Sequence, residues 1–266
     1  MLRNILKITL LAAISFNTFA GQNLDAIYTQ VEELTKRVVD PKDKALLQAR
    51  LAYRIMDSGM YDRARDLAYT IEEPITQSKM LQYIAITYAL TFQKDKAIEV
   101  AEKTPLSNYS IPVYLKIAQI FHLIGLEDVV EPSLARAETE ARALGIPSWE
   151  SAYLAQTAQS YAYCGKLDYA LDLTLNLTEA ADKVETLAAL AAFYENKKME
   201  QEASEVMEIA TKLAQKAWGV QKQADLLLKI AEGYESVAKI PENGEEILRN
   251  YKRKIYSELY DTDGLH

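Results

Sequence analysis

One alanine recurs at a nearly constant interval along the chain, and this repeat limits the folds that the sequence allows. Successive alanines are 33, 33, 40, 33 and 40 residues apart. Bulky residues, mostly apolar, stand four and one positions before the alanine and three positions after it, which is the spacing of one helix face. A fixed period of this length is typical of stacked supersecondary units. The alanines are Ala52, Ala85, Ala118, Ala158, Ala191 and Ala231.

A turn and a second helix are expected after each alanine. Gly59, Gly125 and Gly165 stand seven residues after an alanine, where glycine commonly ends a helix, whereas Phe92 and Lys198 hold this position in the second and fifth units. Small residues let two helices approach closely, and the bulky columns fill the space on either side. The second helix brings a compact residue of its own, twelve positions after the alanine: Ala64, Ala97, Val130, Ala170 and Ala203.

These residues resemble the tetratricopeptide repeat, which has a small residue in each of two helices, an aromatic residue three positions after the first, and a glycine-type turn. The resemblance covers roughly residues 45–250, although the closing proline of the family is displaced to Pro74, Pro105 and Pro147 or is missing. It implies an all-α fold, a right-handed superhelical stack of about six antiparallel helix hairpins with a capping helix at each end. The predicted repeats are about 44–71, 77–103, 111–144, 149–177, 181–218 and 221–259.

The first twenty residues have the composition of a secretory signal peptide. Arg3 and Lys7 give a basic start, Ile8–Phe16 is a short apolar run, and Thr18-Phe19-Ala20 resembles a cleavage site before Gly21. The apolar run is short for a membrane span, although an uncleaved anchor is the alternative. We therefore expect a signal peptide at 1–20, a single repeat domain at 21–266, and export to the periplasm or the exterior.

Both ends of the repeat domain are predicted to carry capping helices, because the ends of a stack would otherwise expose apolar faces. Asn23–Val39 places Leu24, Ile27, Val31 and Leu34 on one face, and Asp40-Pro41 should end this helix. A helix at 245–259 is predicted to cap the other end. The second helices of the third and fifth repeats are predicted to be longer than the others.

The charge balance excludes some partners. The chain has 30 basic and 38 acidic residues and a net charge of −8, and removal of the leader takes away two basic residues. Nucleic acid is therefore not an expected partner, because phosphate contacts require a basic surface. We also expect no membrane association after the leader is cleaved.

The sequence shows no arrangement of residues that is typical of catalysis. It has one cysteine, Cys164, and two histidines, His122 and His266, and it lacks the HExxH, paired CxxC, GxSxG and phosphate-loop motifs. We therefore predict no enzymatic activity, no cofactor and no metal site. Cys164 is predicted to be a small buried residue, with an intermolecular disulfide or a reactive thiol as the alternative in an exported chain.

The resemblance to the tetratricopeptide repeat implies that the first helices line a concave groove. Gln82, Gln119 and Gln159 would form a polar track there that bonds the backbone of an extended peptide. The predicted function is thus an exported scaffold that binds a peptide or protein. The alternatives are an accessory or enzymatic factor of the cell envelope and a repeat protein that binds a small molecule or glycan. The groove residues are Tyr53, Asp57, Lys79, Gln82, Gln119, His122, Gln159, Tyr163, Glu195, Asn196, Glu232 and Glu235.

Overall fold

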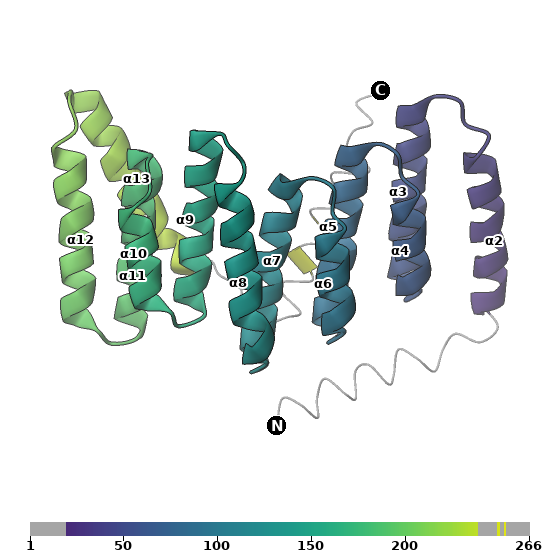
Figure 1. Cartoon of the computed structure of the whole chain (residues 1–266), viewed down its shortest axis with the longest axis horizontal. Helices are drawn as coiled ribbons and strands as arrows, with labels where there is room; N and C mark the ends of the chain where they lie inside the picture. The colour runs from purple at the N-terminus through teal and green to yellow at the C-terminus, as the bar shows by residue number, and fades with distance from the viewer. Residues whose placement is uncertain (1–19, 239–248, 251–252, 254–266) are drawn as a thin grey trace. The chain divides into compact units, whose positions relative to one another are not determined.

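The computed structural model describes residues 20–238, 249–250 and 253, and within these residues every regular element is a helix. The all-α prediction is therefore confirmed for this part of the chain (Figure 1). Nearly all of the predicted leader and most of the predicted C-terminal capping helix lie outside the described residues. The chain divides into two compact units, residues 1–80 and 81–266, which are described separately.

Unit 1 contains α2 (Ala20–Thr35), α3 (Pro41–Asp57), α4 (Tyr61–Tyr69) and the beginning of α5 (Pro74–Leu90). The first helix ends at Thr35, four residues before the predicted end at Val39. Asp40 and Pro41 begin the next helix. The Asp40 carboxylate accepts hydrogen bonds from the backbone N–H groups of Lys42 and Asp43, at 2.9 and 3.0 Å, and Pro41 occupies the first helical turn.

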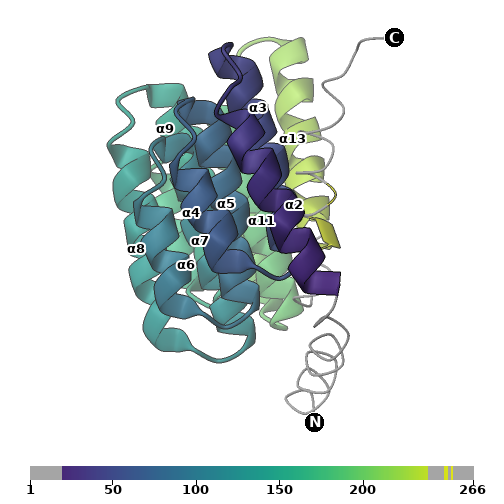
Figure 2. The same cartoon turned by 90° about the vertical axis from the view of Figure 1, so that its right-hand side faces the viewer.

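Within the described residues up to 238, unit 2 contains the rest of α5 and eight further helices, which run alternately up and down (Figures 1 and 2). The pairs α7–α8, α9–α10 and α11–α12 are helical hairpins, and α7, α9, α11 and α13 contact one another in that order. Both α8 and α12 have 16 residues and α10 has 9, so the predicted long second helices are confirmed. The eight helices are α6 (Lys94–Glu102), α7 (Ser107–Leu123), α8 (Glu127–Arg142), α9 (Pro147–Tyr163), α10 (Leu167–Leu175), α11 (Ala180–Asn196), α12 (Glu200–Gln215) and α13 (Val220–Ala238).

Five hairpin turns share one backbone geometry. In each, the residue seven positions after the repeat alanine has a positive φ, and the next N–H donates to the carbonyl at the third position after that alanine. This is the αL ending that favours glycine. Phe92 and Lys198 adopt it with φ 62° although both carry a Cβ atom, so the hairpin keeps its geometry without glycine.

The repeat alanines form the core in five of the six predicted units. Ala52, Ala85, Ala118, Ala158 and Ala191 are at most 1% exposed. The prediction is wrong for the sixth alanine, because Ala231 is exposed. Helix α13 instead packs through Leu226, Gly233 and Val237. Gly233 has no side chain, and the backbone of α11 approaches α13 at this position. The sixth repeat is therefore rotated relative to the predicted register.

The apolar face of α2 was expected to cover the first repeat, and this expectation is wrong. Leu24, Ile27 and Leu34 are 37%, 51% and 59% exposed, whereas Thr35 of the same helix is buried. Among the described helices, none is both long enough and apolar enough to span a membrane.

Candidate binding face on α7 and α9

The predicted groove residues differ widely in their exposure. Three of them, Tyr53, Asp57 and Lys79, belong to unit 1, and the other nine belong to unit 2. Tyr53 and Gln82 are only 6% and 7% exposed, which leaves little surface for a partner. Lys79, Gln119, His122, Gln159 and Tyr163 are half-buried, and Asp57, Glu195, Asn196, Glu232 and Glu235 are exposed.

The predicted polar track of three glutamines is interrupted at its first member. The Gln82 amide is buried and lies 3.5 Å from the carbonyl oxygen of Tyr109, at the limit of a hydrogen bond. Gln119 and Gln159 remain half-buried on α7 and α9. The side chain of Gln159 makes no hydrogen bond within the described part of the chain, so its amide is available to a ligand.

A polar relay joins α7 to α9 through Gln119. Its Nε2 donates to Ser160 Oγ at 3.0 Å, and Ser160 Oγ in turn donates to the backbone carbonyl of Gln156 at 3.0 Å. Because the NH₂ group of Gln119 faces α9, its carbonyl oxygen is directed to the other side. There it accepts a hydrogen bond from Lys116 Nζ at 2.8 Å. The relay therefore fixes the orientation of the amide that holds Lys116.

Lys116 has an unusual environment for a lysine of this acidic chain. Its side chain is half-buried, and burial lowers the pKa of its ammonium group. Within the described residues it forms no ion pair, and the neutral Gln119 amide is its hydrogen-bond partner. Other lysines do contact a carboxylate, among them Lys36, Lys44, Lys94, Lys103, Lys166, Lys212 and Lys229. An ammonium has three donors, so Lys116 has two donors to spare.

Aromatic side chains stand at both ends of this relay. Tyr153 of α9 donates a hydrogen bond to the carbonyl of Asn108 at 3.0 Å, and burial raises the pKa of its hydroxyl. At the other end the rings of His122 and Tyr163 meet edge-on, with centroids 6.1 Å apart. The Nδ1 atom of His122 also lies 2.8 Å from a Glu127 carboxylate oxygen. The α7–α9 face thus combines one cation, amides and aromatic rings.

Sequence reasoning missed Lys116, Tyr153 and Ser160. None of the three belongs to a cluster of ionisable residues or to a groove position that the resemblance implies. Lys116 stands alone in the apolar stretch IPVYLKIAQIF, and this isolation is the signal that would have identified it.

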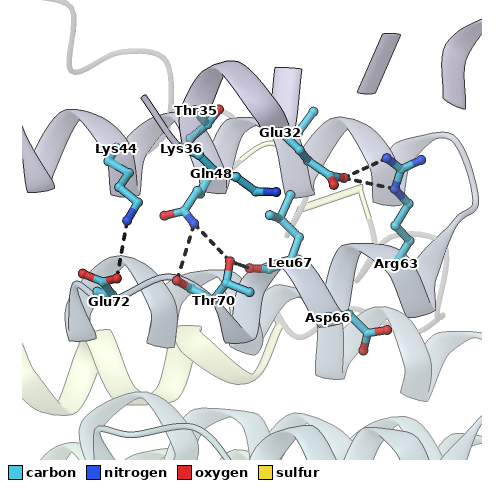
Figure 3. Close-up of a pocket in the computed structure, with 11 residues that line it drawn as sticks. Glu32, Thr35, Lys36, Lys44, Gln48, Arg63, Asp66, Leu67, Thr70 and Glu72 are labelled. Atoms are coloured by element: carbon cyan, nitrogen blue, oxygen red, sulfur yellow. Dashed lines mark hydrogen bonds and ion pairs between the residues drawn. The ribbon is translucent and has the colours of Figure 1, made fainter. Parts of the chain in front are cut away.

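Unit 1 contains a hollow of about 470 Å³ between α2, α3 and α4 (Figure 3). Gln48, 8% exposed, donates an Nε2 hydrogen bond to Thr70 Oγ1 at 3.0 Å across this hollow. Nearby, Lys44 Nζ lies 3.4 Å from a Glu72 oxygen. These contacts join α3 to the end of α4.

The charges around this hollow are largely balanced by one another. Arg63 donates to a Glu32 oxygen through Nε and Nη2, at 3.1 and 2.8 Å, and it also contacts Asp25. Asp66 pairs with Arg65, whose Nη2 is 2.7 Å away. Because each carboxylate has a cationic neighbour, the hollow offers little net charge to select a ligand. We interpret these contacts as the attachment of α2 to the rest of unit 1.

A second hollow, of about 830 Å³, lies along α11 and α12 of unit 2. Three glutamates line it together with two hydroxyl residues and two apolar residues, namely Glu195, Glu200, Glu208, Ser204, Thr211, Ala203 and Met207. Glu195 accepts a hydrogen bond from the Tyr234 hydroxyl. Over the described residues, His, Cys, Asp and Glu side chains do not gather into a set of three that could hold a metal ion.

No protein-family model matches the chain, and a comparison with curated proteins gives no match. One solved structure that is similar is the crystal structure of Ton1535 from Thermococcus onnurineus NA1, with 22% sequence identity and a TM-score of 0.41. The alignment covers 69% of this chain and 57% of that one, so this chain spans somewhat more than half of its length. At this level of similarity, function has to be inferred from the side chains of the chain itself.

Proposed function

We propose that the chain is an exported helical-repeat scaffold of the tetratricopeptide type, whose right-handed stack of hairpins binds a peptide or protein segment. The α7–α9 face of unit 2 is the proposed binding surface. Lys116 is proposed to contact an anionic group of the partner, such as an Asp or Glu side chain or a C-terminal carboxylate.

The recurrence of one hairpin geometry supports the scaffold part of this proposal. Five turns have an αL residue at the same position, and in each the N–H of this residue and the next N–H donate to the carbonyls four and three positions after the repeat alanine. Five repeat alanines are buried. Stacks of this kind present side chains of successive helices along an extended surface. Such a surface suits a linear partner better than it suits a compact one.

The single observation that carries the binding part is the half-buried Lys116 ammonium without a carboxylate. Removing a charge from water is costly unless an opposite charge or several hydrogen bonds compensate for it. Gln119 supplies one hydrogen bond and leaves two donors. A ligand carboxylate would supply the missing charge, and the amides of Gln119 and Gln159 would bond the neighbouring peptide backbone.

The proposal is tested with peptides selected against the purified protein from a displayed library of short random peptides. We expect the selected peptides to be enriched in Asp and Glu. Each peptide is then titrated against the wild type and Lys116→Met, which removes the charge and keeps an unbranched side chain only one atom shorter. Affinity should fall about tenfold or more, because a hydrogen bond to a charged group contributes about 1.5–3 kcal/mol.

Lys222→Met is the matched control, because Lys222 is an exposed lysine of the same unit and lies on α13. It should bind the selected peptides as the wild type does. Equal affinity of Lys116→Met and the wild type would overturn the role of Lys116. Failure of the library to yield any binding peptide would overturn the peptide-binding function itself.

A further inference from the structure

Helix α2 presents an apolar stripe to solvent instead of burying it. The stripe consists of Leu24, Ile27, Val31 and Leu34, of which Val31 is half-buried and the other three are exposed. The spacing of three, four and three residues is that of a helix–helix contact. In this helix the stripe contacts water, although the same chain buries equivalent stripes in its other helices.

A different side of α2 attaches the helix to unit 1, and it does so through polar groups. Arg63 of α4 contacts Asp25 and Glu32, and its Nη2 donates to Thr29 Oγ1 at 3.0 Å. Tyr28 donates from its hydroxyl to the Arg54 carbonyl at 3.3 Å. These contacts fix the rotation of α2 about its axis. Because α2 is held in this rotation, its apolar stripe points away from Arg63 in the folded protein.

The spacing of the stripe residues is the same when it is read backwards, and a leucine stands at each end. Leu24 and Leu34 lie equally far from Thr29 along the helix, and so do Ile27 and Val31. Two copies of α2 that cross antiparallel on a two-fold axis near Thr29 would place Leu24 against Leu34 of the second copy. They would likewise place Ile27 against Val31 of that copy. This self-complementarity is what an isologous contact requires.

The borders of the stripe carry no charge. Gln30 lies on one side, and Tyr28 and Thr35 lie on the other. The carboxylates of α2 are directed elsewhere, because Asp25 and Glu32 contact Arg63 and Glu33 pairs with Lys36 at 2.6 Å. A chain with a net charge of −8 repels its own copies, so a contact between two copies needs an uncharged border.

We propose that the α2 stripe is an interface between two copies of this chain, which pair as antiparallel helices about a two-fold axis. The stripe is about 15 Å long at a rise of about 1.5 Å per residue. It is smaller than the roughly 800 Å² per partner of a standard interface, so the dimer should be weak and form at micromolar concentrations.

The test is sedimentation velocity of the purified protein from low micromolar to several hundred micromolar. The mass should rise from one chain to two over this range. Ile27→Asp should raise the protein concentration at which half of the chains are dimeric by about tenfold or more, because it would bury a carboxylate against Val31 of the second copy. Ile27 is half exposed, so this change should leave the thermal unfolding of the protein nearly unchanged.

Ala26→Asp is the matched control. It adds the same charge to the same helix at an exposed position outside the stripe, and it should dimerise like the wild type. A chain that stays monomeric at every concentration would overturn the proposal. Equal weakening by Ala26→Asp and Ile27→Asp would also overturn it, since the effect would then come from charge and not from the stripe.

The antiparallel arrangement is tested by cysteines under a mild added oxidant. The double variant Ile27→Cys, Val31→Cys should cross-link two copies, because these positions lie opposite each other only in the antiparallel pair. The single variant Ile27→Cys should cross-link much less. Cross-linking of the single variant as strong as that of the double variant would indicate parallel helices and would overturn the proposed axis.

Discussion

A Cβ atom built on Gly233 of α13 would lie 2.0 Å from the carbonyl oxygen of Glu185 in α11. The obstacle is backbone, so it cannot move aside as a flexible side chain would. We expect Gly233→Ala to lower the free energy of unfolding by about 1–3 kcal/mol or more, because the two helices must separate. Urea unfolding followed by circular dichroism measures this loss.

The direction of this change is itself diagnostic. Glycine to alanine inside an unobstructed helix normally stabilises it by about 0.5–1 kcal/mol. Ala231→Gly, at an exposed position of the same helix, should therefore destabilise by only about that amount. A stabilising Gly233→Ala would show that α11 and α13 do not approach so closely.

The turn at Lys198 should be more stable with glycine. Lys198 has φ 62° and is exposed, so its replacement removes strain without removing a core side chain. We expect Lys198→Gly to raise the free energy of unfolding by about 0.5–1 kcal/mol, less than the about 1–2 kcal/mol cost of the left-handed conformation because glycine is freer when unfolded.

The reverse change at an equivalent turn provides the comparison. Gly165 has φ 81° and open space around it, so Gly165→Ala should destabilise by about 1 kcal/mol through backbone strain alone. Thermal unfolding of Lys198→Gly and Gly165→Ala measures whether each change raises or lowers the stability of the protein. The same sign in both would contradict the αL explanation.

Lys116→Met should be more stable than the wild type at neutral pH. Burial lowers the pKa of Lys116 below its ordinary value of 10.5, so the unfolded chain binds this proton more tightly than the folded chain does. The resulting cost is fully present below the folded-state pKa, and wild-type stability recovers as the pH rises towards the unfolded-state value.

Urea unfolding of both proteins at pH 7 and near pH 10 measures this cost. The advantage of Lys116→Met should shrink at the higher pH. An advantage that is absent at pH 7, or that grows with pH, would show that Lys116 is compensated in the free protein.

The Cys164 thiol should be unreactive in the folded protein. Burial raises its pKa to about 12, and the carboxylates of Glu127 and Glu131 add to the shift. On the order of 10⁻⁵ of the thiol is then ionised at pH 7, and the thiolate is the reactive form. Alkylation by N-ethylmaleimide should be slow in buffer and fast in urea. Fast labelling in buffer, or a disulfide-linked dimer, would contradict this prediction.

Local sequence signals predicted the hairpins because those signals act over short distances. Gly59, Gly125 and Gly165 end first helices where a glycine is expected, and the buried alanines follow from the period of the repeat. Which residues share a helix face also follows from the period. Which face of a helix is buried does not follow from the period, and for this reason the apolar stripe of α2 was expected to be buried although it is largely exposed. The prediction that Ala231 is buried was wrong for a similar reason, since Gly233, two residues later, permits a closer approach of α11.

The candidate site was less predictable than the fold. Gln119 was predicted, but its partner Ser160 is 41 residues away and depends on how α7 and α9 meet. The isolation of Lys116 in an apolar stretch is visible in the sequence, but its Gln119 partner and its burial depend on what surrounds it in space. The buried position of Gln82 likewise depends on packing, because nothing in its own sequence neighbourhood distinguishes it from Gln159.

Because α2 is attached through the ionic contacts of Arg63, its attachment should depend on the salt concentration around the protein. Ionic contacts at a surface weaken as salt screens them, whereas the apolar contacts between the other helices do not. Moderate salt should therefore loosen α2 before the other described helices, so that the order of this helix depends on ionic strength. Hydrogen exchange of the α2 amides at low and high sodium chloride, compared with those of α9, would reveal this selective loosening.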